Sequence, residues 1–175
     1  GGARPAPAHA RVTVGHAHVC VRCAARGRTC CEPDDGVSLA PLGPADVLRI
    51  TAATGLDVEA FAREVKLDRI DRAALRLEDP AAAAMLKGAP GRTLLAVDGR
   101  CVFLDRATGC RLAYDVRPLH CRRFPFVRQG RFHVVRPGGA CLAVEESKDL
   151  PDLVERLGTS LAELDRIDAE MRRRE

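Results

Sequence analysis

The chain of 175 residues has no tryptophan, one tyrosine and five phenylalanines. A hydrophobic core must therefore be built mainly from leucine, valine, isoleucine and alanine. Hydrophobic residues make up 46% of the chain, which is enough for such a core and excludes a wholly disordered protein. The length suits one compact domain and is too short for two ordinary ones.

Long apolar runs are also missing. The longest stretches without Asp, Glu, Lys or Arg are residues 12–21 and 36–45, about half of what a membrane-spanning helix needs. We therefore expect a soluble protein with no membrane partner. The chain has no Walker-type glycine loop, GxGxxG, HExxH or nucleophile elbow, so classical nucleotide-dependent and hydrolytic chemistry lacks its usual motifs. No catalytic residue is predicted, and whether the chain is an enzyme stays open.

The two ends of the chain are predicted to differ. Residues 1–15 are rich in Ala, Pro and Gly and are expected to be a flexible lead-in, followed by one domain over residues 16–175. Helices are predicted over 44–55, over 58–65 and over 68–86, the last interrupted by a proline at position 80.

The middle of the sequence is rich in turns. An Asp-Gly turn predicts a hairpin over 94–104, Thr108-Gly109 turns the chain into 110–114, and a second hairpin is expected over 126–135. From residue 151 the chain is predicted helical again, and Ser160 with Glu163 divides it by a capping box. We expect an α+β fold with a small, irregular, short-stranded, metal-organised centre and flanking helices, and all cysteines outside the helices.

Eight cysteines are the most unusual feature of the composition, and they form two groups along the chain: Cys20, Cys23, Cys30, Cys31, then Cys101, Cys110, Cys121 and Cys141. A Cys-x-x-Cys pair can bring two sulfurs to one zinc ion or to an iron–sulfur cluster. Four disulfides or mostly free buried cysteines are the alternatives. Disulfide-dependent domains are usually small because the bridges replace a core, so the helical segments of this chain favour metal binding in the cytoplasm.

Several motifs around the cysteines resemble a known family. They are Cys20-x-x-Cys23 with Cys30-Cys31, Cys101-x-Phe103-Leu104, Cys110-Arg-Leu-x-Tyr114-x-x-Arg117-Pro118-x-x-Cys121-Arg122-x-Phe124-Pro125, and Cys141. Over about residues 18–145 the chain is similar to the YkgJ-type cysteine-cluster proteins, which are described as zinc- or iron-chelating. Six residues separate Cys23 from Cys30, where the common family form is a tight Cys-x-x-Cys-x-x-Cys-Cys.

The resemblance implies that the eight cysteines hold zinc or an iron–sulfur cluster such as 4Fe–4S. Single cysteines scattered around one Cys-x-x-Cys favour the cluster slightly. A related domain occurs in flagellin lysine N-methylases, so a cluster-dependent enzyme that uses S-adenosylmethionine is an alternative. A protein substrate or partner is not predicted.

Polar residues crowd around Cys110 and Cys121, namely Tyr114, Asp115, Arg117 and Arg122. They are candidates for cofactor binding, because guanidinium and amide groups beside a metal centre hydrogen-bond to its sulfur ligands. The alternative is a structural ion pair of Asp115 with Arg117 or Arg122. His16, His18 and His120 are candidate nitrogen ligands or ordinary loop residues.

Residues 116–144 contain arginine but no acidic residue, and phenylalanines lie between the arginines: Arg117, Arg122, Arg123, Arg128, Arg131 and Arg136, with Phe124, Phe126 and Phe132. This pattern is found in modules that bind single-stranded nucleic acid, including zinc-stabilised ones. The interpretation that we favour is that the arginines offset nearby thiolate charge while the phenylalanines fill a small core.

Overall fold

The computed structural model describes residues 18–27, 29–32, 40–87, 91–136 and 141–173. The expected lead-in over residues 1–15 and the candidate ligand His16 lie outside these ranges. Helices and short antiparallel strands make up the described part, which confirms the predicted α+β class. None of its helices has the length and hydrophobicity to cross a lipid bilayer.

A three-stranded antiparallel sheet supports one side of the molecule. Its strands are β1 (Pro41–Leu42), β2 (Ala62–Val65) and β3 (Gly91–Leu94), in the order β1-β3-β2. Helix α2 (Pro44–Thr54) starts with proline, which suits the first turn of a helix, and ends at Gly55 with φ 71°. Its buried Val47 and Ile50 pack with Phe61 and Leu94 in one core cluster, so the predicted helix over 44–55 is confirmed.

The predicted helix over residues 58–65 is wrong. Only Val58–Ala60 form a short 3-10 turn (η1), and Ala62–Val65 pair as β2 in register with β3. Phe61 between them is fully buried and its carbonyl accepts from Leu95 N at 2.8 Å. Pairing with a strand about thirty residues further along the chain therefore outweighs local helix propensity.

The predicted break at Pro80 is confirmed. Helix α3 (Arg69–Glu78) is capped by the Asp68 carboxylate, which accepts from Ile70 N and Asp71 N. Helix α4 (Pro80–Met85) follows at once, because Asp79 caps it through Ala82 N at 3.0 Å. One residue therefore ends the first helix and starts the second.

The centre consists of three small two-stranded hairpins: β4 (Ala96–Val97) with β5 (Arg100–Cys101), β6 (Leu104–Asp105) with β7 (Gly109–Cys110), and β8 (Phe126–Gln129) with β9 (Phe132–Val135). Asp98 and Gly99 both have positive φ, as the predicted Asp-Gly hairpin turn requires. The first hairpin is shorter than predicted because Leu94 belongs to β3. Only Cys110 of the segment 110–114 is a strand residue.

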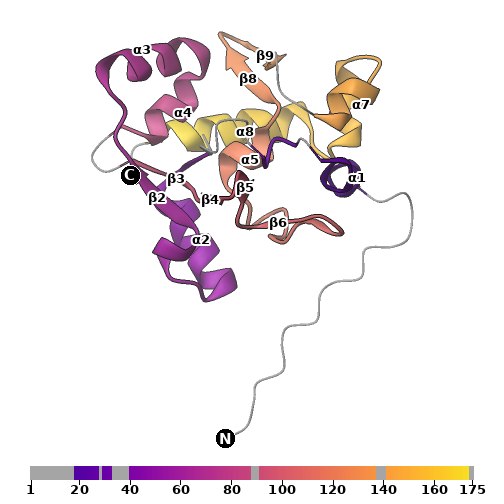
Figure 1. Cartoon of the computed structure of the whole chain (residues 1–175). Coiled ribbons are helices and arrows are strands. Elements are labelled where there is room, and N and C mark those ends of the chain that lie inside the picture. Colours follow the sequence, from indigo (N-terminus) through magenta and orange to yellow (C-terminus); the bar gives the residue numbers. More distant parts are fainter. Residues whose placement is uncertain (1–17, 28, 33–39, 88–90, 137–140, 174–175) are drawn as a thin grey trace, which may run out of the picture.

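Four helices cover the C-terminal half: α5 (Leu119–Arg123), α6 (Leu142–Glu146), α7 (Leu150–Arg156) and α8 (Leu161–Arg172). Ser160 Oγ accepts from Glu163 N at 3.1 Å, so the predicted division into two helices after residue 151 is confirmed. Helix α8 runs through the middle of the molecule, with the β8–β9 hairpin on one side and α2 on the other (Figure 1).

A buried charge network joins α5 to its neighbours. Arg123 is 1% exposed and pairs with Asp79 at the start of α4 and with Asp168 of α8. Asp168 also pairs with Arg172 at 2.8 Å. These ion pairs set the position of the short helix that carries Cys121.

Replacing Arg123 by methionine is expected to lower the free energy of unfolding by about 3–5 kcal/mol, because it leaves two carboxylates buried without their shared cation. The control is Arg131→Met, since Arg131 is exposed and makes no ion pair in the described part. Urea unfolding of both variants measures the difference. A loss below about 1 kcal/mol for Arg123→Met would contradict a structural role for the network.

Candidate metal centre

Helix α1 (Val19–Arg26) carries two of the cysteines on one face. Cys20 and Cys23 are three residues apart, so their side chains lie one turn from each other. His18 caps the helix, since its Nδ1 accepts from Cys20 N at 3.3 Å. The expectation that all cysteines lie outside helices is therefore wrong for this pair, and also for Cys121 in α5.

Salt bridges hold α1 against α6. Arg22 binds the Glu146 carboxylate through both of its terminal nitrogens, at 2.7 and 2.6 Å, and Arg26 pairs with Glu145. The residue that precedes α6 is the buried Cys141. The thiols of Cys20 and Cys141 both lie within electrostatic range of Cys23. Cys20, Cys23 and Cys141 are called the α1 thiol group below.

A second set of thiols lies against the core cluster beneath the sheet. Cys101 belongs to this cluster, and Cys31, Cys110 and Cys121 pack against it. Cys101 N donates to the Cys31 carbonyl at 2.8 Å, which ties the N-terminal cysteine segment to the first hairpin. The thiol of Cys121 lies within electrostatic range of the other three. These four are called the inner thiol group: Cys31, Cys101, Cys110 and Cys121.

Cys30 lies between the two groups. Its thiol shares a hydrogen bond with Cys31, and Cys121 and Cys20 are its next sulfur neighbours. Although much of the residue is exposed, its sulfur is desolvated. The shared hydrogen bond raises the pKa of Cys30 and lowers that of Cys31.

None of the eight cysteines forms a disulfide. Burial raises the pKa of Cys20 to about 11 and that of Cys101 to about 12, and it also raises the pKa of Cys121 and Cys141. A buried thiol becomes a thiolate when a cation compensates its charge. The donor set therefore fits a soft metal ion or an iron–sulfur core.

The cysteine sulfurs do not form a ready-made coordination site for one metal ion. Within the described ranges, no three His, Cys, Asp or Glu side chains have an arrangement that holds one metal ion. The groups are gathered from distant segments, but a bound centre requires either small movements of the thiols or a core larger than one ion.

The two thiol groups meet where β7 packs against α1. Gly109 precedes Cys110 and has φ 82°, and a Cβ at this position would lie 3.5 Å from the Cys20 carbonyl oxygen and 3.4 Å from Val21 Cα. Glycine therefore serves both the turn conformation and the close approach. This contact brings Cys110 of the inner thiol group next to the helix of the other group.

Arg117 faces the thiols. It donates a hydrogen bond to the Cys110 sulfur, and its charge lowers the pKa of Cys20, Cys31 and Cys110 against the effect of burial. Among the four predicted cofactor-binding residues, Arg117 is the one whose side chain contacts a cysteine in the described part.

The other three candidates behave differently. Arg122 pairs with Glu163 at 2.6 Å, and its guanidinium stacks on the Tyr114 ring at 5.1 Å. The Tyr114 hydroxyl and Arg122 Nε are buried without a hydrogen-bond partner among the described residues. Asp115 is exposed, and its side chain makes no ion pair in these ranges. The alternative of an ion pair between Asp115 and Arg117 or Arg122 is therefore wrong.

The described histidines are occupied elsewhere. His18 Nδ1 caps α1, and a hydrogen bond links its ring to the Leu157 backbone. Burial lowers the pKa of His120 to about 4, so its Nδ1 faces Asp79 at 3.9 Å as a neutral imidazole rather than as an ion-pair partner. Neither ring is directed at the cysteines by these contacts.

The arginine-rich segment is mostly neutralised within the fold. Arg123 is buried, Arg122 pairs with Glu163, Arg128 with Asp165 at 2.6 Å and Arg136 with Glu78 at 3.5 Å. Phe126 is buried, whereas Phe132 at the hairpin tip is 61% exposed beneath Arg131. This pairing favours a structural role for the segment over a nucleic-acid surface.

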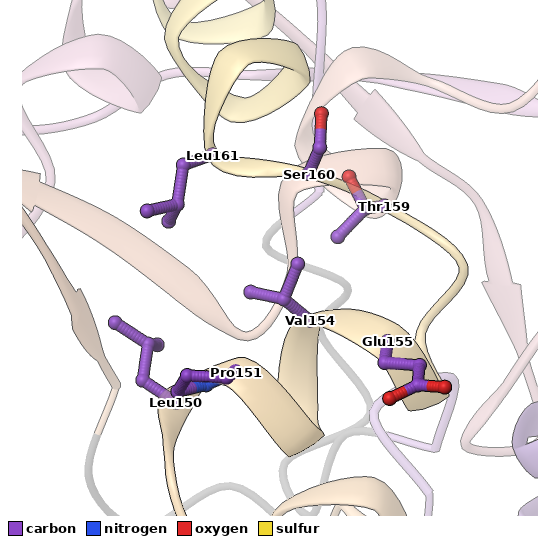
Figure 2. A pocket seen from close by; sticks show the side chains of 7 residues that line it. All are labelled: Leu150, Pro151, Val154, Glu155, Thr159, Ser160 and Leu161. Atoms are coloured by element: carbon purple, nitrogen blue, oxygen red, sulfur yellow. The ribbon is translucent and has the colours of Figure 1, made fainter.

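An apolar hollow lies between α7 and the start of α8 (Figure 2), lined by Leu150, Pro151, Val154, Glu155, Thr159, Ser160 and Leu161. It contains no cysteine and one charged side chain. Two of its lining residues, Leu150 and Val154, pack against the core cluster that contains Cys141, and the hollow offers few polar groups for a cofactor.

Sequence reasoning missed the residues that hold the site in place. Buried Asp46 accepts from Leu119 N at 3.1 Å and pairs with Arg49, which donates to the Arg117 carbonyl at 3.2 Å. The sequence signal of Asp46 is only that of an acidic residue in a first helical turn. Its partners lie about seventy residues away, so the sequence pattern alone does not reveal them.

Comparison with known proteins gives one match. A family model named CxxCxxCC, described as "Putative zinc- or iron-chelating domain", matches residues 19–142, which is more than half of the chain. No match is found among curated proteins or among solved structures.

A thiol assay tests whether the eight cysteines are free of disulfides. Protein prepared without reductant, then unfolded in denaturant with a metal chelator, is expected to release all eight thiols to dithiobis(nitrobenzoate). Four disulfides would instead leave a count near zero, which would contradict a metal-binding donor set.

Proposed function

Because the chain belongs to the CxxCxxCC family of zinc- or iron-chelating domains, we propose that its eight cysteines bind metal as thiolates in two groups. The observation that carries this proposal is the gathering of unpaired thiols from distant segments into two neighbouring places in the fold. The coarser conclusion, a metal-binding domain, follows from the family.

The inner thiol group supplies four donors to one centre in this proposal. Its members come from the turn at residues 29–32, from β5, from β7 and from α5, and they lie on one side of a single core cluster. Four thiolates complete a zinc site or the corners of a cubane cluster.

The α1 thiol group supplies three donors, and Cys30 completes it. The inner thiol group already has four members, and Cys30 has Cys20 among its sulfur neighbours. The six-residue spacing between Cys23 and Cys30 follows the structure, because α1 continues to Arg26 before Gly27 turns the chain.

An iron–sulfur cluster is the metal centre that we favour for the inner thiol group. Tetrahedral zinc holds its sulfurs about 2.3 Å from the ion, hence about 4 Å from one another. In a cluster the iron corners and inorganic sulfide stand between the thiolates. The inner thiol group consists of single cysteines from four separate segments and contains no Cys-x-x-Cys pair, which favours the larger core.

A hydrogen-bond donor beside the cysteines supports a bound sulfur-rich centre. Arg117 already donates to Cys110 and is the donor that the structure places at the thiols. The Tyr114 hydroxyl and Arg122 Nε are buried without an acceptor among the described residues, but their contacts are with each other's side chains and with Glu163. A donor such as Arg117 stabilises thiolate and sulfide and raises the reduction potential of a cluster. Asp115 is not included, because it is exposed.

The proposal is metal binding, in a soluble cytoplasmic protein, and does not include a reaction. The use of S-adenosylmethionine and a link to lysine methylation stay predictions from the resemblance. A nucleic-acid-binding zinc module is not favoured, because acidic side chains pair with most arginines in the described part of residues 116–144.

Metal and sulfide analysis of protein purified without oxygen tests the choice of centre. We expect a brown protein that contains iron and acid-labile sulfide, because single cysteines scattered around one Cys-x-x-Cys favour a cluster over a zinc site. Stoichiometric zinc with no visible absorption would contradict the iron–sulfur assignment, and a chain without bound metal would contradict the proposal as a whole.

The partition into two groups is tested by reciprocal variants. Cys121→Ser is expected to lose the metal of the inner thiol group and keep the other, whereas Cys141→Ser should do the reverse. Cys30→Ser should behave like Cys141→Ser, and each variant should retain the metal of one group only. Loss of all metal from every variant, with an unchanged circular dichroism spectrum, would show one shared centre instead.

A further inference from the structure

Arg117 occupies the junction between the two thiol groups. Its guanidinium donates to Cys110 of the inner thiol group, and its charge also acts on Cys31 of that group and on Cys20 of α1. The approach of β7 to α1 at Gly109 explains this reach, because Cys110 follows the residue that touches Cys20. One cation therefore lies near both groups.

The position of Arg117 is fixed by its own bonds. Its backbone N donates to the Ala113 carbonyl at 3.1 Å, its Nε donates to the Leu112 carbonyl at 3.1 Å, and its carbonyl accepts from Arg49 at 3.2 Å. Arg49 is held in turn by the buried Asp46. The guanidinium is thus anchored and not a mobile surface group.

No carboxylate neutralises Arg117 within the described residues, whereas Arg122, Arg123, Arg128 and Arg136 all pair with acidic side chains. The remaining exposed arginine of this segment, Arg131, lies at the tip of the β8–β9 hairpin. Arg117 is therefore a partly buried cation whose counter-charge in the described structure is sulfur.

Two loaded centres so close together repel each other. Four thiolates with one divalent ion, or with a 4Fe–4S core, carry a net charge of about −2. A positive charge near both anions lowers the free energy of each loaded centre, and these two contributions together offset part of the repulsion when both are loaded.

We propose that Arg117 is a shared counter-ion that stabilises bound metal in both thiol groups. The proposal rests on the two-group metal binding argued above. It assigns Arg117 an electrostatic role in both groups, so that the loss of one charge changes the metal affinity of both.

Cobalt(II) added to the reduced, metal-free full chain provides the test, because thiolate-to-cobalt absorption counts the ions as they bind. We expect two ions for the unaltered protein. Arg117→Gln should bind both ions more weakly, each by about tenfold, the size expected when a unit charge next to partly buried anions is lost. Tenfold corresponds to about 1.4 kcal/mol.

Two further variants separate charge from other effects. Arg117→Lys keeps the charge and should bind both ions within about threefold of the unaltered protein. Arg131→Gln removes the same charge at the exposed hairpin tip and should bind both ions normally. If circular dichroism shows that Arg117→Gln does not fold, Arg117→Lys alone tests the proposal. A loss of second-ion binding in Arg117→Lys as large as that in Cys141→Ser would overturn the shared-charge role.

The outcomes distinguish this inference from the proposed function. No cobalt bound by the unaltered chain overturns two-group metal binding itself. A single bound ion, unchanged affinity for either ion in Arg117→Gln, or an equal loss in Arg131→Gln overturns the role of Arg117 while metal binding stands.

Discussion

The packing of α1 between β7 and α6 is the constraint on which the thiol site depends. Ion pairs from Arg22 and Arg26 hold α1 to α6, and Gly109 allows β7 to approach it closely. Cysteines more than a hundred residues apart in the chain become neighbours through these two contacts. The hydrophobic core is also divided into two apolar clusters. The inner thiol group lies at one of them, and Cys20 and Cys141 of the α1 thiol group lie at the other.

Arginine is used in two ways around this site. Arg123 lies between buried carboxylates and sets the position of α5, which carries Cys121. Arg117 has no carboxylate in the described part and faces sulfur instead. The charges of Arg123 and its carboxylate partners are balanced without metal. The charge of Arg117 is balanced only when the neighbouring thiols ionise. The fold thus contributes a fixed cation near donors that burial keeps protonated.

Local signals predicted much of the fold, because capping residues, Pro80 and the Asp98-Gly99 turn act within a few residues. They did not reveal β2, whose partner strand is distant, or the helix that carries Cys20 and Cys23. The family motif identified the cysteines, while their partition depends on tertiary contacts such as Cys101 N to the Cys31 carbonyl. Arg123 looked like one of several equivalent arginines, and only burial distinguishes it.

X-ray absorption spectroscopy of the metal-loaded full chain tests the central claim most directly, because it reports the atoms bound to the metal. The account predicts a first shell made only of sulfur, at about 2.3 Å, with no nitrogen or oxygen at about 2.0–2.1 Å. The described histidines cap α1 (His18), face Asp79 (His120) or pair with Asp165 (His133), so they should not contribute. A mixed shell containing imidazole or carboxylate would contradict binding by the cysteine thiolates alone.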